Sequence, residues 1–389
     1  MTRVAVLMSG GVDSSVAALL LKNQGYEITG FYLNYTPYCN PQDELDARRV
    51  AEILGIKFYS LDITEEFEEK IINYFVKSYE NGLTPNPDVF CNDLIKFGIF
   101  LDKALNLNFE KIATGHYARI LKDENGYHLL AGKDKNKDQS YFLWKIKKDK
   151  LEKIIFPIGE LTKEEVRKIA SENNFPNAFK KGSSGICFVG PVKLREFLNN
   201  YLKPKEGLII DTKGNILGKH PGYFYFTEGQ RHGLNIKIGG GPYYVVKKIP
   251  EENLIIVAKE GEPELYTKKI EIAEINILEK EILFPQTNAN DKQTNADNIN
   301  NIYSSGNNPG NSIVIDVRFR YRQPLVKAKL ILTNNTEFTE PKQNLQNSSV
   351  ISAYVEFLEP QKMIAPGQSI VFYKDDLVLG GGIIKRKID

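Results

Sequence analysis

A short run of glycine and serine near the start of the chain has the residue types of an anion-binding loop. Ser9–Ser15 reads Ser-Gly-Gly-Val-Asp-Ser-Ser, directly after the apolar run Val4–Met8 and directly before a helical pattern. At a strand-to-helix turn, backbone N–H groups and the helix dipole favour a phosphate group, and glycines let the backbone approach it closely. Asp13 could hold a Mg²⁺ ion beside the phosphates. A tight turn capped by serine is the alternative, but the whole run between strand and helix favours phosphate binding.

Two cysteines lie in segments that could make their thiols reactive. Cys91 lies in Gly82–Asn92, where two prolines stiffen the chain and could present Asp88 and Cys91 at a helix N-terminus. That position lowers the pKa of a thiol, although a free cysteine on its own is often a small buried apolar residue. Cys187 lies in the glycine- and serine-rich run Gly182–Gly190. Two such cysteines suit a persulfide mechanism, because a sulfur carried on one thiol needs a second thiol to release it.

The elements that must position these residues alternate through the first half of the chain. Short apolar runs predict strands at Val4–Met8, Ile28–Leu33, Phe58–Leu61 and Lys111–Thr114. Helical spacing predicts helices at Ser14–Asn23, Asp43–Leu54, Phe67–Tyr79 and Ile95–Asn106. Alternation of this kind predicts an α/β domain with a doubly wound parallel sheet covered by helices on both faces.

The pattern changes near Pro191, where a helix at Val192–Leu202 is followed by short strands. These predicted strands are Gly207–Asp211, Tyr223–Thr227, Tyr243–Ile249, Leu254–Ala258, Ile313–Tyr321, Val326–Leu332, Ser352–Phe357 and Ser369–Tyr373. We predict three domains: a catalytic domain over residues 1–195, a β-rich connector over 196–267 and a C-terminal β-barrel over 268–389. Asn-rich stretches near 286–311 and 333–349 are interpreted as loop insertions in the barrel.

Composition limits the class of protein. The chain has 389 residues, and its 42% hydrophobic and 26% charged residues are ordinary for a globular protein. No apolar run is long enough to span a bilayer, so we expect no membrane association. The small, odd number of three cysteines argues against a disulfide framework and favours the cytoplasm. Because they form no CxxC pair, a structural zinc and a cysteine-ligated iron–sulfur cluster are not expected. The net charge of +2 neither requires nor excludes a nucleic-acid partner.

The phosphate loop and both cysteine segments resemble known families. Ser9–Ser15 lacks a Walker lysine and resembles the PP-loop signature of ATP pyrophosphatases, which implies ATP and the adenylation of a substrate oxygen. The segment from Gly82 to Gly98 resembles the central motif of the tRNA-specific 2-thiouridylases, and Gly182–Gly190 resembles their second cysteine motif. By this resemblance Cys187 carries a persulfide, Cys91 is the nucleophile that pairs with it as a disulfide, and Asp88 gives acid–base help. One departure is Gly182, which stands where the family has an acidic residue.

The resemblance also assigns ligand contacts. The nucleotide contacts it implies are Leu7, Met8, Ser9, Gly10, Gly11, Val12, Asp13, Ser14, Leu33 and Gly115. The tRNA contacts it implies are Asn86, Pro87, Asp88, His116, Asp138, Gln139, Ser140, Arg320, Tyr321 and Gln368. Gly115 would let the backbone approach the adenine or ribose, and Arg318–Gln323 interleaves arginine with aromatic residues, which suits phosphates and unpaired bases.

The function that the resemblance implies is ATP- and Mg²⁺-dependent 2-thiolation of the wobble uridine of tRNA. The sulfur donor would be a relay protein or a cysteine desulfurase. Three alternatives remain: a PP-loop synthetase or amidoligase acting on a small molecule, a non-catalytic tRNA-binding protein, and a thiolase acting on cytidine or another uridine.

Overall fold

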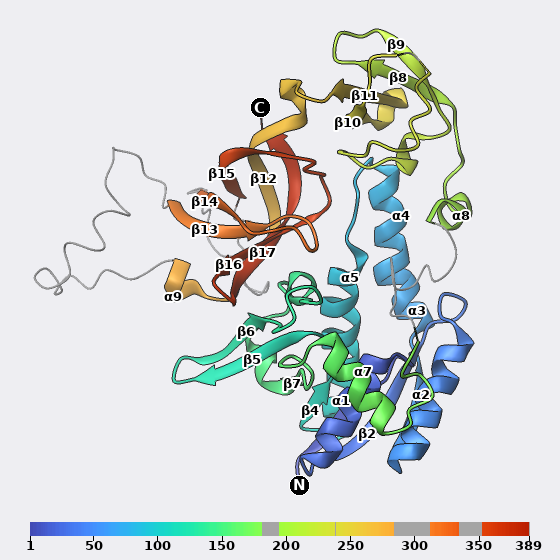
Figure 1. The fold of residues 1–389 in the computed structure, drawn as a ribbon, viewed down its shortest axis with the longest axis vertical. Coiled ribbons are helices and arrows are strands. Elements are labelled where there is room, and N and C mark those ends of the chain that lie inside the picture. The colour runs from blue at the N-terminus through green and yellow to red at the C-terminus, as the bar shows by residue number, and fades with distance from the viewer. Residues whose placement is uncertain (181–193, 238, 284–311, 334–351, 389) are drawn as a thin grey trace, which may run out of the picture.

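The computed structural model describes residues 1–180, 194–237, 239–283, 312–333 and 352–388. Within these ranges the strands form a five-stranded, a four-stranded and an eight-stranded sheet. Figure 1 shows the five-stranded sheet and its helices at the bottom of the molecule, near the N-terminus, and the four-stranded sheet at the top. The barrel lies at the side, between these two levels. The expected doubly wound sheet, β-rich connector and C-terminal barrel are thus confirmed as fold classes.

The N-terminal sheet is parallel and buried on both faces. Its order is β3-β2-β1-β4-β7, with β3 (Lys57–Asp62), β2 (Glu27–Asn34), β1 (Arg3–Leu7), β4 (Lys111–Ala113) and β7 (Ile154–Ile155). Alternate residues of β1 enter different cores: Ala5 and Leu7 pack into one, Val4 and Val6 into the other. This is the period of two that a strand imposes, and it explains why the strand reads as a continuous apolar run.

Helices cover the two faces. The Val4 face packs against α1 (Val12–Asn23), α2 (Pro41–Leu54) and α7 (Lys163–Glu172). The Ala5 face packs against two long helical stretches. They are α3 (Thr64–Phe67), η1 (Glu68–Ile72) and α4 (Asn73–Glu80), then α5 (Pro87–Phe90), η2 (Cys91–Phe100) and α6 (Leu101–Asn106).

The second helical stretch starts earlier than the apolar spacing predicted. It begins with Pro87 at its first helical position, rather than at Ile95. Proline is well suited to that position because its missing N–H would be unpaired there in any case. The middle part, η2, has the wider turns of a π-helix, a form found mostly at functional sites.

The connector is a small mixed sheet with one prediction wrong. Its order is β10-β11-β8-β9, with β10 (Tyr243–Ile249), β11 (Leu254–Lys259), β8 (Gly207–Asp211) and β9 (Ile216–His220). The strand predicted at Tyr223–Thr227 is instead the 3₁₀ turn η5 (Tyr223–Tyr225). The two tyrosines of this turn bond to different helices. The Tyr223 hydroxyl donates to the carbonyl of Glu80 at the end of α4, and the Tyr225 hydroxyl donates to the side chain of Asn199. The helix predicted at Val192–Leu202 is present as α8 (Leu194–Asn199), and its first two predicted residues lie outside the described ranges.

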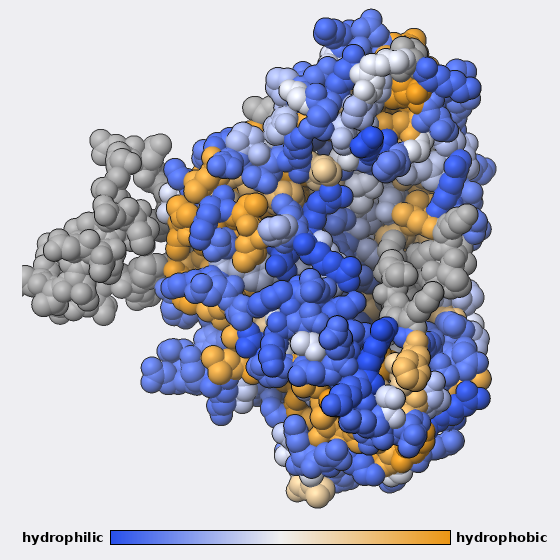
Figure 2. Space-filling view, in the orientation of Figure 1, coloured by the Kyte–Doolittle hydropathy of each residue, from blue (hydrophilic) through white to orange (hydrophobic). Residues whose placement is uncertain are grey.

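The barrel is antiparallel, and it closes where its first strand pairs with its last. Its strands follow the order β12-β15-β14-β13-β16-β17, with a further pairing of β12 with β17. They are β12 (Tyr266–Ile277), β15 (Ser352–Lys362), β14 (Val326–Thr333), β13 (Ser312–Arg318), β16 (Ser369–Lys374) and β17 (Leu377–Ile388). Figure 2 shows exposed apolar side chains gathered over this part of an otherwise largely hydrophilic face.

A hairpin from the N-terminal part extends the barrel sheet. β5 (Ala118–Asp123) and β6 (Gly126–Ala131) pair with each other, and Leu130 of β6 pairs with Leu377 of β17. This hairpin was not predicted, although Asn125-Gly126, where the turn enters β6, is a dipeptide typical of hairpins. The N-terminal part and the barrel therefore share one hydrogen-bonded sheet.

The Asn-rich stretches fall almost entirely outside the described residues. None of the helices in the described ranges is long and apolar enough to cross a membrane.

Candidate functional site

The loop Ser9–Ser15 connects β1 to α1 at the carboxyl edge of the sheet. Gly11 precedes α1, and no side chain caps this end of the helix. The serine hydroxyls bond within the loop instead: Ser14 Oγ donates to the carbonyl of Gly11 at 3.1 Å and accepts from the N–H of Ser9 at 3.1 Å. The first-turn N–H groups of α1 are therefore the donors that an anion would meet, and the serine-capped turn is not what forms.

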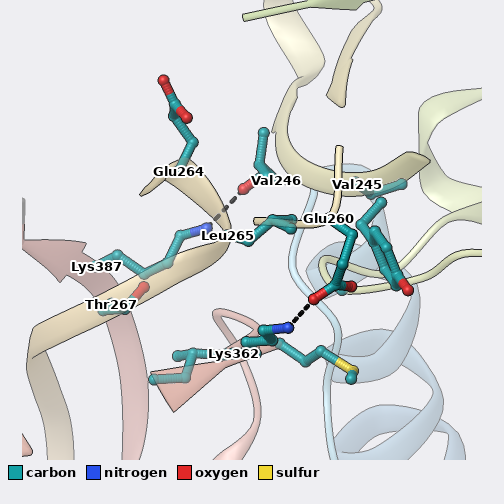
Figure 3. Close-up of a pocket in the computed structure, with 12 residues that line it drawn as sticks. Val245, Val246, Glu260, Glu264, Leu265, Thr267, Lys362 and Lys387 are labelled. Atoms are coloured by element: carbon teal, nitrogen blue, oxygen red, sulfur yellow. Dashed lines mark hydrogen bonds and ion pairs between the residues drawn. The ribbon is translucent and has the colours of Figure 1, made fainter. Parts of the chain in front are cut away.

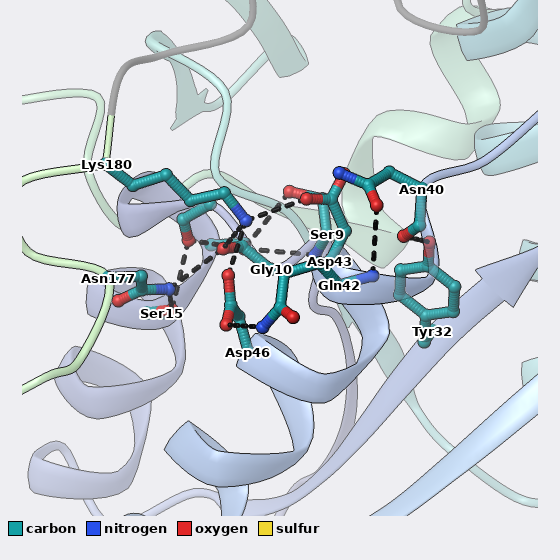
Figure 4. A network of polar contacts seen from close by, with 12 residues as sticks. Ser9, Gly10, Ser15, Tyr32, Asn40, Gln42, Asp43, Asp46, Asn177 and Lys180 are labelled. Atoms are coloured by element: carbon teal, nitrogen blue, oxygen red, sulfur yellow. Dashed lines mark hydrogen bonds and ion pairs between the residues drawn. The ribbon is translucent and has the colours of Figure 1, made fainter. Parts of the chain in front are cut away.

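A polar network holds the back of this loop (Figure 4). The buried amide of Asn177 donates to the carbonyl of Gly10 at 3.0 Å and to Ser15 Oγ at 2.9 Å. Lys180 Nζ lies 2.7 Å from Asp43 Oδ1 and 2.6 Å from Asp46 Oδ2, at the start of α2. These contacts tie the loop to two segments distant in sequence. Sequence reasoning missed Asn177 and Lys180, because no local pattern marks them.

The pKa values in this network follow from its geometry. Burial alone would raise the pKa of Asp46, but hydrogen bonds from Lys180 and Gln42 outweigh it and lower this pKa. Burial would likewise lower the pKa of Lys180, and its two carboxylate partners raise it instead. The carboxylate and the ammonium group are both charged at neutral pH, so the network is an ion pair.

Asp13 is engaged on both oxygens. Lys163 Nζ lies 2.6 Å from its Oδ1 and 2.8 Å from its Oδ2, and the Tyr117 hydroxyl donates to Oδ1 at 2.7 Å. Burial first, and then the charge of Asp13, raises the pKa of Tyr117, so the phenol keeps the proton that it donates. Among the described residues, no group of three or more His, Cys, Asp or Glu side chains could hold a metal ion. Asp13 fits a Mg²⁺ ion only as a single protein ligand, with phosphates and water as the others.

The other predicted nucleotide contacts lie at the carboxyl ends of neighbouring strands. Leu7 ends β1 and Met8 follows it, Leu33 lies near the end of β2, and Gly115 lies just after β4. This edge is where parallel α/β sheets bind ligands. A Cβ on Gly115 would lie 2.5 Å from the backbone nitrogen of Ser14, so glycine is required here for packing against the phosphate loop. Its predicted contact with the adenine or ribose stays a prediction.

Asp88 and Cys91 lie on the helix that begins at Pro87. Asp88 is half-buried in the first turn of α5, and Cys91 begins η2 with its side chain only 4% exposed, in the core of the Ala5 face. Cys187 and Gly182 lie outside the described residues. The pairing of Cys91 with Cys187 therefore stays a prediction.

The predicted tRNA contacts divide by exposure. Buried are Asn86, Pro87, His116, Asp138 and Ser140; half-buried are Asp88, Gln139, Tyr321 and Gln368; exposed is Arg320. The roles of all ten in tRNA binding stay predictions, and the buried members make contacts within the protein.

Asp138 and its neighbours join the N-terminal part to the barrel. Asp138 Oδ2 accepts from Arg318 Nη1 of β13 at 3.0 Å, and its Oδ1 accepts from the N–H groups of Gly132 and Ser140. The Tyr141 hydroxyl donates to the carbonyl of Ser369 in β16 at 2.9 Å. This motif is thus a structural link between two parts of the molecule.

His116 and Gln139 are also engaged. His116 Nδ1 lies 2.7 Å from Thr114 Oγ1, and burial lowers the pKa of His116 well below its usual value, which leaves the imidazole neutral. Gln139 Oε1 accepts from the N–H of Tyr117 at 3.0 Å.

Arg320 and Tyr321 lie just beyond the end of β13, not on the strand as predicted. The Arg320 side chain is exposed, and its Nη1 lies 3.1 Å from Met363 Sδ. The Tyr321 ring packs 4.6 Å from that of Phe142. Of the arginines in this run, Arg320 and Arg322 are exposed, while Arg318 pairs with the buried Asp138.

A small cavity at the junction of connector and barrel is not the candidate site (Figure 3). Its volume is about 20 Å³, room for about one water molecule. Lys362 pairs with Glu260 beside it, while Lys387 Nζ donates to the carbonyl of Val246 at 2.6 Å and lies 2.7 Å from Glu228 Oε2. These contacts hold the barrel to the connector.

Comparison with protein families gives three consecutive matches. Residues 2–191 match the tRNA methyl transferase HUP domain, residues 195–259 the tRNA methyl transferase PRC-barrel domain, and residues 292–384 the aminomethyltransferase beta-barrel domain.

Curated relatives are similar over the whole chain. The tRNA-specific 2-thiouridylase MnmA 1 of Geobacillus kaustophilus is 41% identical over 396 residues, covering 99% of this chain and 96% of that protein. The tRNA-specific 2-thiouridylase MnmA of Treponema denticola is 42% identical over 395 residues, covering 98% of each. That of Bacillus subtilis is 39% identical, covering 98% of this chain and 95% of the relative.

Proposed function

The chain belongs to the family of tRNA-specific 2-thiouridylases, and on that basis we propose that it is an ATP-dependent sulfurtransferase that converts the wobble uridine of tRNA to 2-thiouridine. The observation that carries the proposal is the extent of the match, 41% identity over 99% of the chain. A match of the phosphate loop alone would have left the substrate open. The alternative of a small-molecule synthetase is not favoured, because the match includes the connector and the barrel.

The first step is adenylation. ATP transfers AMP to O2 of the uracil and releases pyrophosphate, which turns a poor leaving oxygen into AMP. The N–H groups at the start of α1 bind the phosphates, and Asn177 and Lys180 keep the loop in shape from behind.

Mg²⁺, when bound, would neutralise charge on the pyrophosphate. Asp13 is the residue that would hold it, and Lys163 would then share that carboxylate rather than occupy both oxygens.

The second step is sulfur transfer. The terminal sulfur of a persulfide on Cys187 attacks C2 of the uracil, and AMP leaves. The Cys91 thiolate then attacks Cys187 Sγ, so that the S–S bond to the base breaks and its electron pair stays with the new 2-thio group. The product is a Cys91–Cys187 disulfide, which a thiol reductant must reduce before the next cycle. We assign proton transfer near the base to Asp88, which lies in the first turn of α5.

The tRNA and the sulfur donor complete the proposal. The uridine must leave the anticodon stack to reach the site, so the enzyme binds an extruded base, and Arg320 contacts phosphate. The persulfide comes from a sulfur-relay protein or a cysteine desulfurase. The cytoplasm supplies the reduced thiols that the cycle needs.

A pyrophosphate-release assay tests the adenylation step. With ATP and unmodified tRNA, we expect release that depends on the tRNA. Release without tRNA would favour a small-molecule synthetase, and no release under either condition would favour a non-catalytic tRNA-binding protein.

A further inference from the structure

The segment between α4 and the Cys91 helix is held from outside the N-terminal domain. The N–H of Thr84 donates to the carbonyl of Pro366 at 2.9 Å. In return, Gln368 Nε2 donates to the carbonyl of Thr84 at 2.8 Å and to that of Pro85 at 3.2 Å. Pro366 and Gln368 belong to the turn before β16. The barrel therefore bonds to both N–H and C=O groups of this segment.

The approach of the two backbones is close. A Cβ on Gly367 would lie 2.9 Å from both the nitrogen and the oxygen of Thr84. At the start of the segment, a Cβ on Gly82 would lie 2.6 Å from the Pro250 ring in the connector. The segment therefore packs closely against both the barrel and the connector.

The sequence of the segment explains why it needs an outside donor. Pro85 and Pro87 have no N–H group, so the backbone cannot donate hydrogen bonds at those two positions. Its carbonyls must accept bonds from elsewhere. The amide of Gln368 supplies donors for two consecutive carbonyls at once.

The next residue, Asn86, is linked to the barrel through Tyr141 of the N-terminal part. The side chain of Asn86 is a hydrogen-bond partner of the Tyr141 hydroxyl, which donates to the carbonyl of Ser369. Ser369 follows Gln368 directly in the chain. The barrel turn thus holds Thr84 and Pro85 directly, and Tyr141 links Asn86 to β16, immediately before the helix that carries Asp88 and Cys91.

We propose that Gln368 is a positioning residue for thiolation, holding Thr84–Pro85 from the barrel so that Asn86, Asp88 and Cys91 meet the target base in a fixed arrangement. The proposal rests on the proposed function and assigns Gln368 to the shape of the catalytic segment, not to a tRNA contact. The two roles differ in what they change: a lost tRNA contact weakens binding, whereas a misplaced catalytic segment slows the reaction of bound tRNA.

The test compares Gln368→Ala with Gln361→Ala, a matched control in β15 whose side chain donates to the nearby carbonyl of Glu359. We would measure the single-turnover rate of thiolation at saturating tRNA and the tRNA dissociation constant at two salt concentrations. For Gln368→Ala we expect a rate lower by on the order of tenfold to a hundredfold, since misplacement of about 1 Å can cost that much. The dissociation constant and its salt dependence should stay within about twofold of the wild-type values, and Gln361→Ala should match wild type.

Gln368→Asn keeps the test decisive if the alanine variant is unstable. It retains the amide but is one methylene shorter, so it should fold and still lose rate. An unchanged rate in Gln368→Asn and Gln368→Ala, or weaker tRNA binding with an unchanged rate at saturation, would overturn the positioning role. Wild-type protein assayed in parallel separates this from failure of the proposed function: if wild type itself forms no 2-thiouridine, the function is wrong and the positioning role falls with it.

Discussion

Two arginines two positions apart serve different purposes at the scale of single residues. Arg318 is 13% exposed and pairs with Asp138, which is 2% exposed. Arg318→Ala would leave this carboxylate buried without its partner, so we expect the free energy of unfolding to fall by about 3–5 kcal/mol. Arg320→Ala removes an exposed charge and should leave stability within about 0.5 kcal/mol of wild type. Urea unfolding of both variants measures the difference.

The same pair separates stability from binding. Arg320→Ala should weaken the binding of every tRNA substrate to a similar extent. The slope of log affinity against log salt concentration should fall in magnitude by about 1. If Arg320→Ala binds tRNA like wild type at every salt concentration, the proposed phosphate contact is wrong.

Asn177 allows a second test at this scale. Asn177→Ala removes two hydrogen bonds to the phosphate loop and leaves Ser15 Oγ and the Gly10 carbonyl less well satisfied. We expect a loss of about 1–3 kcal/mol in stability and a higher KM for ATP in the pyrophosphate-release assay. An unchanged KM would mean that the loop keeps its shape without this support.

Residue types and their order along the chain predicted only part of the phosphate-binding site. Ser9–Ser15 was predictable because its strand, glycines and helix are adjacent in the chain. Lys163, Asn177 and Lys180 were not, because they reach the loop from residues 150 to 170 positions away and lie in no local motif.

At the scale of elements, the β5–β6 hairpin is joined to the barrel by a histidine. His128 Nε2 lies 2.9 Å from Asp123 Oδ1, and its Nδ1 lies 2.9 Å from Glu279 Oε1, which follows β12. Lys148 Nζ lies 2.8 Å from the other oxygen of Glu279. An imidazole can donate to two carboxylates only when it is protonated. Burial lowers the pKa of His128, but its bonds to Asp123 and Glu279 outweigh burial and raise this pKa above 6.5.

Stability should therefore depend on pH through this residue. A raised pKa in the folded state contributes stability that is fully present below the unfolded pKa of about 6.5 and is lost as pH rises through the folded value. The excess stability of wild type over His128→Gln should be largest below about pH 6.5 and shrink at higher pH. Urea unfolding of the two proteins at several pH values checks this, and a difference that grows with pH would contradict it.

Element types were more predictable than their partners. Four of the five strands in the parallel sheet were predicted from short apolar runs, and the two-residue strand β7 was missed. The clearest run is β1, because burial on both faces makes it continuously apolar. The hairpin was missed despite Asn125-Gly126, and β12 and β17 were missed altogether. The strand predicted at Tyr223–Thr227 was wrong because a run of aromatic residues forms a strand only when a neighbouring strand pairs with it. Here the run forms a 3₁₀ turn, and the hydroxyls of Tyr223 and Tyr225 bond to α4 and α8.

For the whole molecule, adenylation and sulfur transfer are separate chemical steps. Cys91→Ser and Cys187→Ser should each abolish 2-thiouridine formation while keeping tRNA-dependent pyrophosphate release, because adenylation needs neither thiol. Cys39→Ser is the control, since Cys39 bonds to Asn34 within its own loop and should keep both activities. If either cysteine variant thiolates tRNA like wild type, the two-thiol mechanism is wrong.

The most direct test of the central claim is mass spectrometry of nucleosides from unmodified tRNA incubated with the protein, ATP and a persulfide donor. The account predicts 2-thiouridine at the wobble position, formed only when ATP is present. No sulfur in the tRNA, sulfur at cytidine or another uridine, or thiolation without ATP would contradict it.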